Sequence, residues 1–406
     1  MATAMPQSAV RLTLLMCVAE SLSMTGFACY TTLLPVLLKA WALNNSEAGL
    51  ISGVFYTGYM IAVPVLTSLT DRIDSRRVYL FACLLSAAGA AGFALFANGL
   101  WSAAFFQFLI GAGLAGTYMP GLKTLTDHLE GKAQSRATAF YTAGFGLGSS
   151  ISIVLSGKLG AVFGWQWAFA FGAIGPVFAA LLVMFAAPAG RRHARHEQTA
   201  GLLDFRPVLK NRTTRLYVLG YSLHNYELFG HRSWMVAFLV FCGSLQPAGM
   251  SLPLAAATLA AMINALGPVM SVTGNELALR FGRERMIFLF MGTSGLLACV
   301  VGFTASWPWL VVFLLMCVHY GCMLGDSAAL TSGVIAATPP PQRGATMAVY
   351  SFSGFTAAFL APLVFGVVLD LAGGNQSQIA WGLAFASIGI FGVFAPVARW
   401  VHAKKR

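Results

Sequence analysis

Apolar residues occur along this chain in long runs that are separated by short polar segments. Twelve runs reach the length of about twenty residues that an α-helix needs to cross a bilayer. Lipid offers no partner for backbone N–H and C=O groups, so we expect every run to form a transmembrane helix. The runs cover residues 11 to 38, 47 to 68, 78 to 96, 102 to 125, 137 to 157, 167 to 185, 216 to 241, 254 to 277, 286 to 303, 309 to 336, 346 to 369 and 379 to 400.

The composition supports the same fold class, an all-α integral membrane protein. Hydrophobic residues make up 58% of the 406 positions and charged residues only 9%, which excludes a soluble domain with a solvated surface. The seven cysteines lie singly within the apolar runs, without the spacing of a metal site. We therefore expect a protein in contact with a lipid bilayer, with no metal site and no cofactor.

The positions of Lys and Arg predict the orientation. If the N-terminus is cytoplasmic, nearly all basic loop residues fall on the cytoplasmic side, and only Lys39 and Lys158 lie in loops on the other side. This asymmetry predicts twelve crossings with both termini in the cytoplasm, as for a multi-pass protein of the cell inner membrane. The net charge of +12 then reflects topology and contact with lipid headgroups, and we expect no nucleic-acid partner.

The longest polar segment divides the chain into two groups of six predicted helices. We expect an N-terminal bundle over residues 1–187, a cytoplasmic linker over 188–214 and a C-terminal bundle over 215–406. The two halves match at a constant spacing, which indicates duplication of a six-helix unit. The matched pairs are Leu69 and Leu277, Arg72 and Arg280, Arg77 and Arg285, Ala137 and Ala345, and Thr138 and Thr346. Such repeats in transporters surround a central cavity that holds substrate near the membrane midplane.

The run from 216 to 241 is unusual because its middle is polar. His224, Glu227 and His231 stand at i, i+3 and i+7, so they share one face of a helix, and Arg232 follows directly. Ionisable groups at membrane depth are costly unless they face water, a ligand or a partner. The run therefore indicates either a polar cavity or a polar contact between packed helices.

Two loops resemble a known family. Residues 69–77, Leu-Thr-Asp-Arg-Ile-Asp-Ser-Arg-Arg, are similar to the signature loop of the major facilitator superfamily, and residues 277–285 resemble its second copy. Asp74 and Ser75 depart from the usual loop pattern, as does Leu279 in the second copy. The resemblance implies twelve helices in two repeats and a gate at the cytoplasmic ends. Its candidate residues are Asp71, Arg72, Arg77, Arg280 and Arg343; the alternative is a fixed ion pair that only aids folding.

Two further family patterns are altered. Gln107 stands where many proton-coupled members have arginine, and the glycine-rich segment 144–150 lacks the proline of drug–proton antiporters. In the superfamily, helices 1, 4, 7 and 10 line the central cavity. The mid-span ionisable residues of this chain fall on those four helices: Glu20, Lys123, His224, Glu227, His231, Arg232, His319 and Asp326.

Arg232 is our candidate for holding a substrate carboxylate or phosphate, because a guanidinium offers two parallel donors and a permanent charge. The alternative is an internal ion pair with Asp326 or Glu20. Lys123 is a second cationic candidate, although a pair with Asp127 would also explain it. The further candidate substrate-binding residues are His224, His231, Asn225, Tyr30, Tyr118, Tyr221 and Tyr320.

For a coupling proton we expect Glu227 first, then Glu20 and Asp326, with His319 as a further member. A carboxyl group in a cavity of low dielectric constant can link the binding of a proton to that of a substrate. The alternative is a carboxylate locked to Arg232.

The sequence thus predicts a secondary active transporter of a small anionic organic solute, working by proton symport and alternating access. The alternatives are an exporter of drugs or metabolites by proton antiport and, more distantly, a membrane receptor. No nucleophile triad or phosphate loop is present in the sequence, so we do not expect an enzyme. The expected partners are a small-molecule substrate, protons and lipid, and we expect a monomer.

Overall fold

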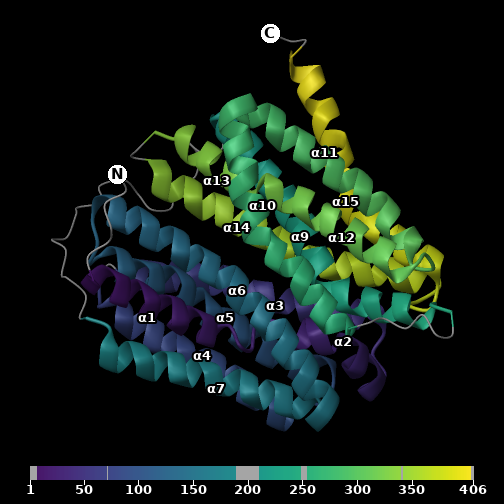
Figure 1. Ribbon diagram of the computed structural model, residues 1–406, viewed down its shortest axis with the longest axis horizontal. Coiled ribbons are helices and arrows are strands. Elements are labelled where there is room, and N and C mark those ends of the chain that lie inside the picture. Colours follow the sequence, from purple (N-terminus) through teal and green to yellow (C-terminus); the bar gives the residue numbers. More distant parts are fainter. Residues whose placement is uncertain (1–6, 71, 189–209, 248–253, 340–341, 404–406) are drawn as a thin grey trace. The chain divides into compact units, whose positions relative to one another are not determined.

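A computed structural model describes residues 7–70, 72–188, 210–247, 254–339 and 342–403 of the chain (Figure 1). Within these ranges the ordered elements are helices, and no strand occurs. The chain forms two compact units. Unit 1 contains residues 1–36 and 54–197, and unit 2 contains residues 37–53 and 198–406.

The first half of the chain supplies seven helices, drawn from purple to teal in Figure 1. Their bounds are α1 Gln7–Ser23, α2 Cys29–Ala40, α3 Asn45–Leu69, α4 Ser75–Phe96, α5 Leu100–Thr126, α6 Gly131–Phe163 and α7 Trp165–Ala186. The second half supplies α9 Arg212–Ser244, α10 Ala256–Phe281, α11 Arg283–Val301, the 3-10 turn η1 Gly302–Thr304, α12 Trp309–Gly325, α13 Ser327–Ala336, α14 Arg343–Leu371 and α15 Gln378–Ala403.

Each of the twelve predicted membrane runs corresponds to helix in the structure, so the all-α membrane fold is confirmed. Ten runs form one main helix, whereas the first and the tenth are interrupted. The first run breaks into α1 and α2 at residues 24–28, and the tenth breaks into α12 and α13 at Asp326. Interrupted helices free backbone groups for other partners, and in transporters they accompany binding sites.

The break between α1 and α2 is stabilised by α6. The hydroxyl of Ser152 donates to the carbonyl oxygen of Thr25 at 2.8 Å and accepts from the backbone N–H of Ala28 at 3.0 Å. The Ala28 N–H would otherwise be unsatisfied in an apolar interior, and the Thr25 carbonyl oxygen would keep only a weak contact with the Cys29 thiol. Gly26 lies at the same break and packs against Gly172 of α7, where the two backbones meet without intervening side chains.

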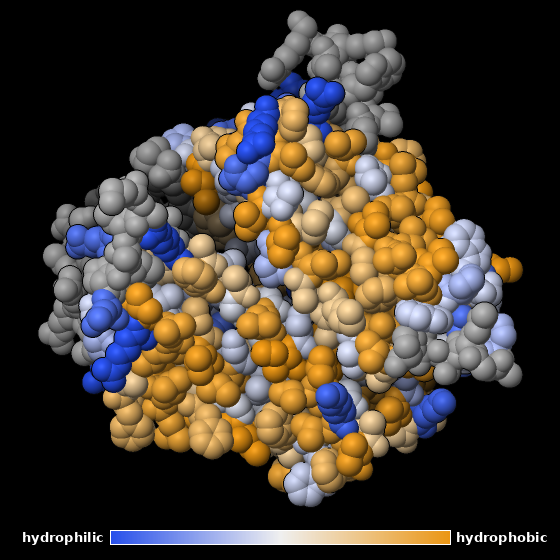
Figure 2. All heavy atoms as spheres, viewed as in Figure 1, coloured by the Kyte–Doolittle hydropathy of each residue, from blue (hydrophilic) through white to orange (hydrophobic). Residues whose placement is uncertain are grey.

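The described part of the chain contains nine helices that are long and apolar enough to cross a membrane by length and composition. α9 is not among them, because polar residues occupy its middle. Large apolar side chains are exposed along the other helices, for example Trp101, Phe185 and Val269. Figure 2 shows apolar residues over most of the visible face, with strongly hydrophilic residues in separate patches. A surface of this kind is stable against lipid and unstable against water.

Candidate functional site

The polar run of α9 is buried inside unit 2 and does not face lipid. His224, Glu227 and His231 are at most 5% exposed, and Arg232 is half-buried. The prediction that the three residues share a helix face is consistent with their common burial. Each of them meets a different surrounding, so the run is a series of distinct contacts and not one cluster.

Glu227 is held by two helices at once. Its Oε1 lies 2.9 Å from Nε2 of His319 on α12, and its Oε2 accepts a hydrogen bond from the hydroxyl of Ser294 on α11 at 3.0 Å. The His319 ring is fully buried. A carboxyl and an imidazole at this distance can share one proton between them, as a neutral pair or as an ion pair.

His224 forms the second carboxyl–imidazole pair of unit 2. Its Nδ1 lies 2.7 Å from Oδ1 of Asp326, and both side chains are only 2% exposed. The two atoms are not aligned for a well-formed hydrogen bond. At this distance either the imidazole nitrogen or the carboxyl oxygen has to carry a proton, because the lone pairs of two unprotonated atoms would repel. Asp326 stands at the break between α12 and α13.

His231 has no hydrogen-bond partner at either ring nitrogen among the described residues, although it is completely buried. Its ring lies edge-on to that of His319 with centroids 5.0 Å apart, and it also contacts Tyr320 and Phe385. Buried polar groups are usually paired, so an unpaired imidazole here is unusual. It lies between the partner of Glu227 and the partner of Arg232.

Arg232 is held by a phenol and not by a carboxylate. Its Nε and Nη2 both donate to the hydroxyl oxygen of Tyr320, at 2.9 and 2.7 Å, and that hydroxyl donates to Oδ1 of Asn264 at 2.8 Å. Among the residues that the structure describes, no acidic side chain lies within ion-pair distance of Arg232. A guanidinium has five N–H donors, and this arrangement uses two of them.

The two internal ion pairs that the sequence left open for Arg232 are not formed in this structure, nor is the lock of Glu227 onto Arg232. Asp326 is engaged by His224 and Glu227 by His319. Aromatic rings flank the guanidinium instead: its carbon lies 5.9 Å from the centroid of Phe229 and 5.8 Å from that of Tyr320. Cation–π attraction to these rings stabilises the charge in part and leaves the anion-binding edge available.

Glu20 is the buried acid of unit 1. It is 0% exposed, and its Oε2 accepts from the hydroxyl of Tyr141 on α6 at 2.8 Å, with a longer contact of 3.5 Å from Ser23. Its Oε1 has no hydrogen-bond partner in the described part of the chain. Among the described residues, Glu20 therefore contacts hydroxyls and no imidazole, whereas Glu227 and Asp326 each contact an imidazole.

The remaining substrate-binding candidates fall in both units. In unit 1, Tyr118 stacks on Tyr141, Tyr30 packs on Phe93, and the Lys123 ammonium donates to the carbonyl oxygen of Thr70 at 3.0 Å. The Lys123 contact ties the end of α3 to α5, so a structural role explains it. In unit 2, Tyr221 stacks on Tyr350 with centroids 3.8 Å apart, and Asn225 is buried with an amide nitrogen that has no partner among the described residues.

The candidate gate residues are only partly visible. Asp71 and the side chain of Arg343 lie outside the described residues, whereas Arg72, Arg77 and Arg280 are exposed. The neighbouring Asp74 caps α4 by accepting from the Arg76 backbone N–H, and the Arg76 side chain pairs with Asp74 at 3.1 Å. Arg76 also donates to the carbonyl oxygen of Ala187, which joins the start of α4 to the end of α7.

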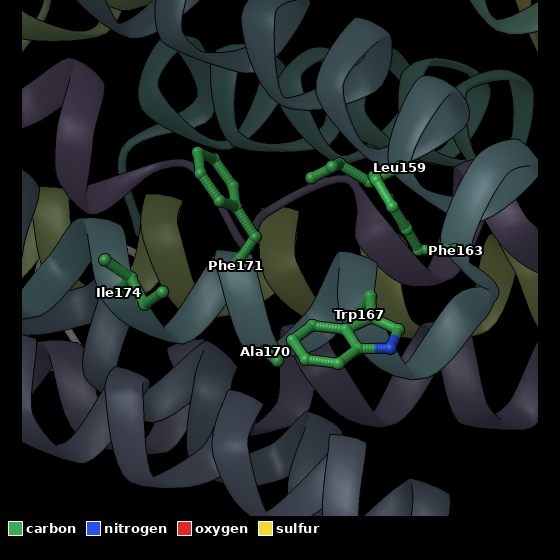
Figure 3. A pocket seen from close by; sticks show the side chains of 6 residues that line it. All are labelled: Leu159, Phe163, Trp167, Ala170, Phe171 and Ile174. Carbon is green, nitrogen blue, oxygen red and sulfur yellow. The ribbon is translucent and has the colours of Figure 1, made fainter.

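A cavity on unit 1 has quite different chemistry. It lies between α6 and α7, has a volume of about 330 Å³ and is formed by apolar side chains (Figure 3). Its lining residues are Leu159, Phe163, Trp167, Ala170, Phe171 and Ile174. A cavity with no charged or strongly polar lining cannot select an ionic solute, so this cavity is not part of the candidate site.

Three partners of the site were not predicted from the sequence. Tyr141, Ser294 and Asn264 contact Glu20, Glu227 and Tyr320, respectively. All three are polar residues inside predicted membrane runs, so the sequence does show them as departures from the apolar pattern. Serine, tyrosine and asparagine are frequent enough between membrane helices that their positions along one sequence do not identify a site.

The fold and the buried charges define a multi-pass helical membrane protein with paired ionisable groups in its interior. The sequence model of the Major Facilitator Superfamily matches residues 16–275, which is more than half of the chain. The chain therefore belongs to the major facilitator superfamily. It is a transporter and not an enzyme, which decides against the receptor alternative.

Similar proteins agree with this assignment. The uncharacterized MFS-type transporter YwfA of Bacillus subtilis is 26% identical over 89% of this chain and 85% of its own length. The niacin transporter NiaP of Acinetobacter baylyi is 24% identical over 37% of this chain and 34% of its own length. The 4-hydroxybenzoate transporter PcaK of the same organism is 29% identical over 39% of this chain and 34% of its own length. The crystal structure of a bacterial homolog to the human lysosomal transporter Spinster has the same fold, with a TM-score of 0.78 over 97% of this chain and 96% of that one at 15% identity.

Proposed function

We propose that this protein is a secondary active transporter of a small organic anion, driven by proton symport through alternating access. The observation that carries the proposal is the surrounding of Arg232, a half-buried guanidinium that meets a phenol and aromatic rings where a carboxylate would be expected. A buried charge without a counter-ion is costly. A ligand carboxylate would supply the missing charge and form two parallel hydrogen bonds.

Coupling between solute and proton follows from two neighbouring residues of α12. His319 contacts Glu227, and the next residue, Tyr320, contacts Arg232. If a solute carboxylate replaces the Tyr320 hydroxyl on Arg232, the freed Tyr320 ring still contacts His231, whose ring lies edge-on to that of His319. A change in position there alters the stability of the shared proton, which is the linkage that symport requires.

An aromatic carboxylate is the solute class that we favour. Phe229 and Tyr320 flank the guanidinium, and Phe229 lies 6.1 Å from the ring of Phe355, so flat apolar surfaces adjoin the anion-binding edge. Two of the relatives are named for niacin and 4-hydroxybenzoate, each of which contains one aromatic ring and one carboxylate. We place the protein in the cell inner membrane with both termini cytoplasmic, in agreement with its Lys and Arg distribution.

Purified protein in liposomes tests the proposal. Radiolabelled benzoate, 4-hydroxybenzoate and nicotinate should enter protein-containing vesicles when the outside is made acidic, and collapse of the pH gradient should stop accumulation. Arg232→Lys keeps the charge but loses the planar fork, so we expect uptake to fall by about tenfold or more. Arg215→Lys, on an exposed arginine of the same helix, is the matched control.

Two results would contradict the proposal. Undiminished uptake by the Arg232→Lys protein would remove the anion-binding role of Arg232. Accumulation of the solute when the vesicle interior is acidic, and not when the outside is acidic, would favour the exporter alternative by proton antiport.

A further inference from the structure

The apolar cavity between α6 and α7 belongs to unit 1 alone and is elongated along both helices. Its lining residues recur at helical spacing, at i and i+4 on α6 and at i, i+3, i+4 and i+7 on α7. Figure 3 shows Trp167 at one end of the cavity and Ile174 at the other. Since a helix rises about 1.5 Å per residue, the cavity follows α7 for about 10 Å.

Two small residues explain why this space is empty of side chains. Gly164 alone connects α6, which ends at Phe163, to α7, which begins at Trp165, and its φ is +93°. Glycine adopts that conformation without a steric penalty. Ala170 is the one small residue among the six that line the cavity. It leaves a volume of about 330 Å³, which is room for about ten water-sized groups.

The walls of the cavity are exposed. Phe163, Trp167 and Ile174 are 62%, 64% and 47% exposed, respectively. In a multi-pass membrane protein, exposed apolar walls on a membrane helix meet lipid chains. A cavity that follows the helices also runs in the direction of those chains. An acyl chain within it touches protein on more than one side, so it gains more dispersion contacts than a chain on a flat helix face.

A cation stands beside the same cavity. Lys158 directly precedes the lining residue Leu159 and is exposed, and no acidic side chain of the described residues lies within ion-pair distance of it. Only Lys158 and Lys39 fall in loops on the predicted external side, so a lysine here departs from the general distribution. Its carbon stem can cover apolar surface while the ammonium reaches the level of the lipid headgroups. An exposed tryptophan such as Trp167 is typical of that level.

We propose that the cavity and Lys158 form a binding site for one anionic glycerophospholipid. One acyl chain occupies the cavity, and the Lys158 ammonium pairs with the lipid phosphate. The orientation predicted from Lys and Arg places this lipid in the external leaflet. A neutral chain needs an apolar cavity and its phosphate needs a cation, so one ligand accounts for both features. The site requires only that the protein lies in a membrane, and it stands or falls separately from the proposed solute.

Quenching of tryptophan fluorescence by a brominated lipid tests the site directly. Delipidated protein in detergent is titrated with phosphatidylglycerol whose acyl chains carry bromine, which quenches tryptophans in close contact with the chain. We expect a saturable decrease in fluorescence, and we expect Trp167→Phe to remove it. Trp101→Phe is the matched control, because Trp101 is an exposed tryptophan of α5 that does not line the cavity. It should keep the saturable decrease.

Two further variants separate the acyl chain from the headgroup. Ala170→Leu fills the cavity, so several methylenes lose their burial and the affinity for phosphatidylglycerol should fall about tenfold or more. Ala161→Leu, on an exposed alanine of α6 outside the cavity, should bind lipid like the unmodified protein. Lys158→Gln should weaken phosphatidylglycerol about fivefold and phosphatidylcholine little, because choline already neutralises that phosphate. Lys39→Gln should change neither lipid.

The proposal is overturned if Trp167→Phe keeps the saturable quenching, or if Ala170→Leu binds phosphatidylglycerol as tightly as the unmodified protein. Equal losses in Lys158→Gln and Lys39→Gln would also overturn it, since the attraction would then be general. Conversion of a dimer to a monomer by Ala170→Leu, with lipid binding unchanged, would assign the cavity to a second copy of the chain. Trp167→Phe and Lys158→Gln alter no buried packing, so they decide the question even if Ala170→Leu does not fold.

Discussion

Glu20 and Glu227 are both glutamates in the interior of membrane helices, and both are at most 5% exposed, yet their surroundings differ. In unit 1 the carboxyl of Glu20 meets the hydroxyls of Tyr141 and Ser23. In unit 2 the carboxyl of Glu227 meets the imidazole of His319 at 2.9 Å. The same side chain, buried to a similar extent, is therefore placed in two chemically different surroundings.

The difference bears on which acid can carry a coupling proton. A hydroxyl can donate to a carboxylate but cannot supply a compensating charge, so we expect Glu20 to keep its proton through the cycle. An imidazole can take up a proton from a carboxyl and return it. Glu227 and Asp326, each paired with a histidine, are thus better suited to exchange protons during transport than Glu20.

The largest expected effect is that of Glu227→Gln. With one proton carried per monovalent anion, a gradient of one pH unit supports about tenfold accumulation of the solute. The amide cannot bind the transported proton, so we expect the accumulation ratio of Glu227→Gln to fall to about one. Exchange of labelled for unlabelled solute across the membrane should continue, because Arg232 is intact. Uptake and exchange by the same vesicles measure both quantities.

Glu276→Gln provides the control for this change, since Glu276 is an exposed glutamate on α10. It should accumulate solute like the unmodified protein. Driven accumulation at the normal level by Glu227→Gln would remove that residue from the coupling mechanism.

A smaller effect is expected for Asp326→Asn. The amide can still contact His224 but cannot form an ion pair with it, and the break between α12 and α13 stays in place. Loss of a charged hydrogen-bond partner of this kind should lower the initial rate of driven uptake about three- to tenfold. If Asp326→Asn instead abolishes accumulation and Glu227→Gln does not, the coupling pair is His224 with Asp326.

The smallest effect is expected for Glu20→Gln. Glutamine has the shape of a protonated glutamate, and its amide oxygen can accept from Tyr141 as the carboxyl does. We expect driven uptake to stay within about twofold of the unmodified rate, because a neutral hydrogen bond replaces a neutral hydrogen bond. A complete loss of accumulation with normal exchange would reverse the comparison and make Glu20 the coupling residue.

Helix positions were predictable from the sequence because the length of an apolar run and the thickness of a bilayer are sufficient to locate a membrane helix. The breaks at residues 24–28 and at Asp326 were not predicted. Gly26 and Gly325 lie at these breaks, but glycine occurs throughout the apolar runs and so does not mark a break by itself. The first break also depends on a distant partner, Ser152 of α6.

The candidate site was predictable as a set of residues but not as a set of pairs. Buried charge is rare enough in a membrane protein that His224, Glu227 and Arg232 stood out in the sequence. Their partners depend on helix rotation and on which helices are neighbours, which one sequence does not specify. For that reason the sequence left an internal acid open as the partner of Arg232, whereas the structure shows Tyr320.

Proton movement on solute binding tests the central claim most directly. Purified protein in weakly buffered detergent solution with a pH-indicator dye should take up or release protons when benzoate or the preferred aromatic acid is added. The account predicts that this signal persists in Glu20→Gln and is lost in Glu227→Gln while solute binding, followed by thermal stabilisation, remains. A signal that persists in Glu227→Gln and vanishes in Glu20→Gln would contradict it.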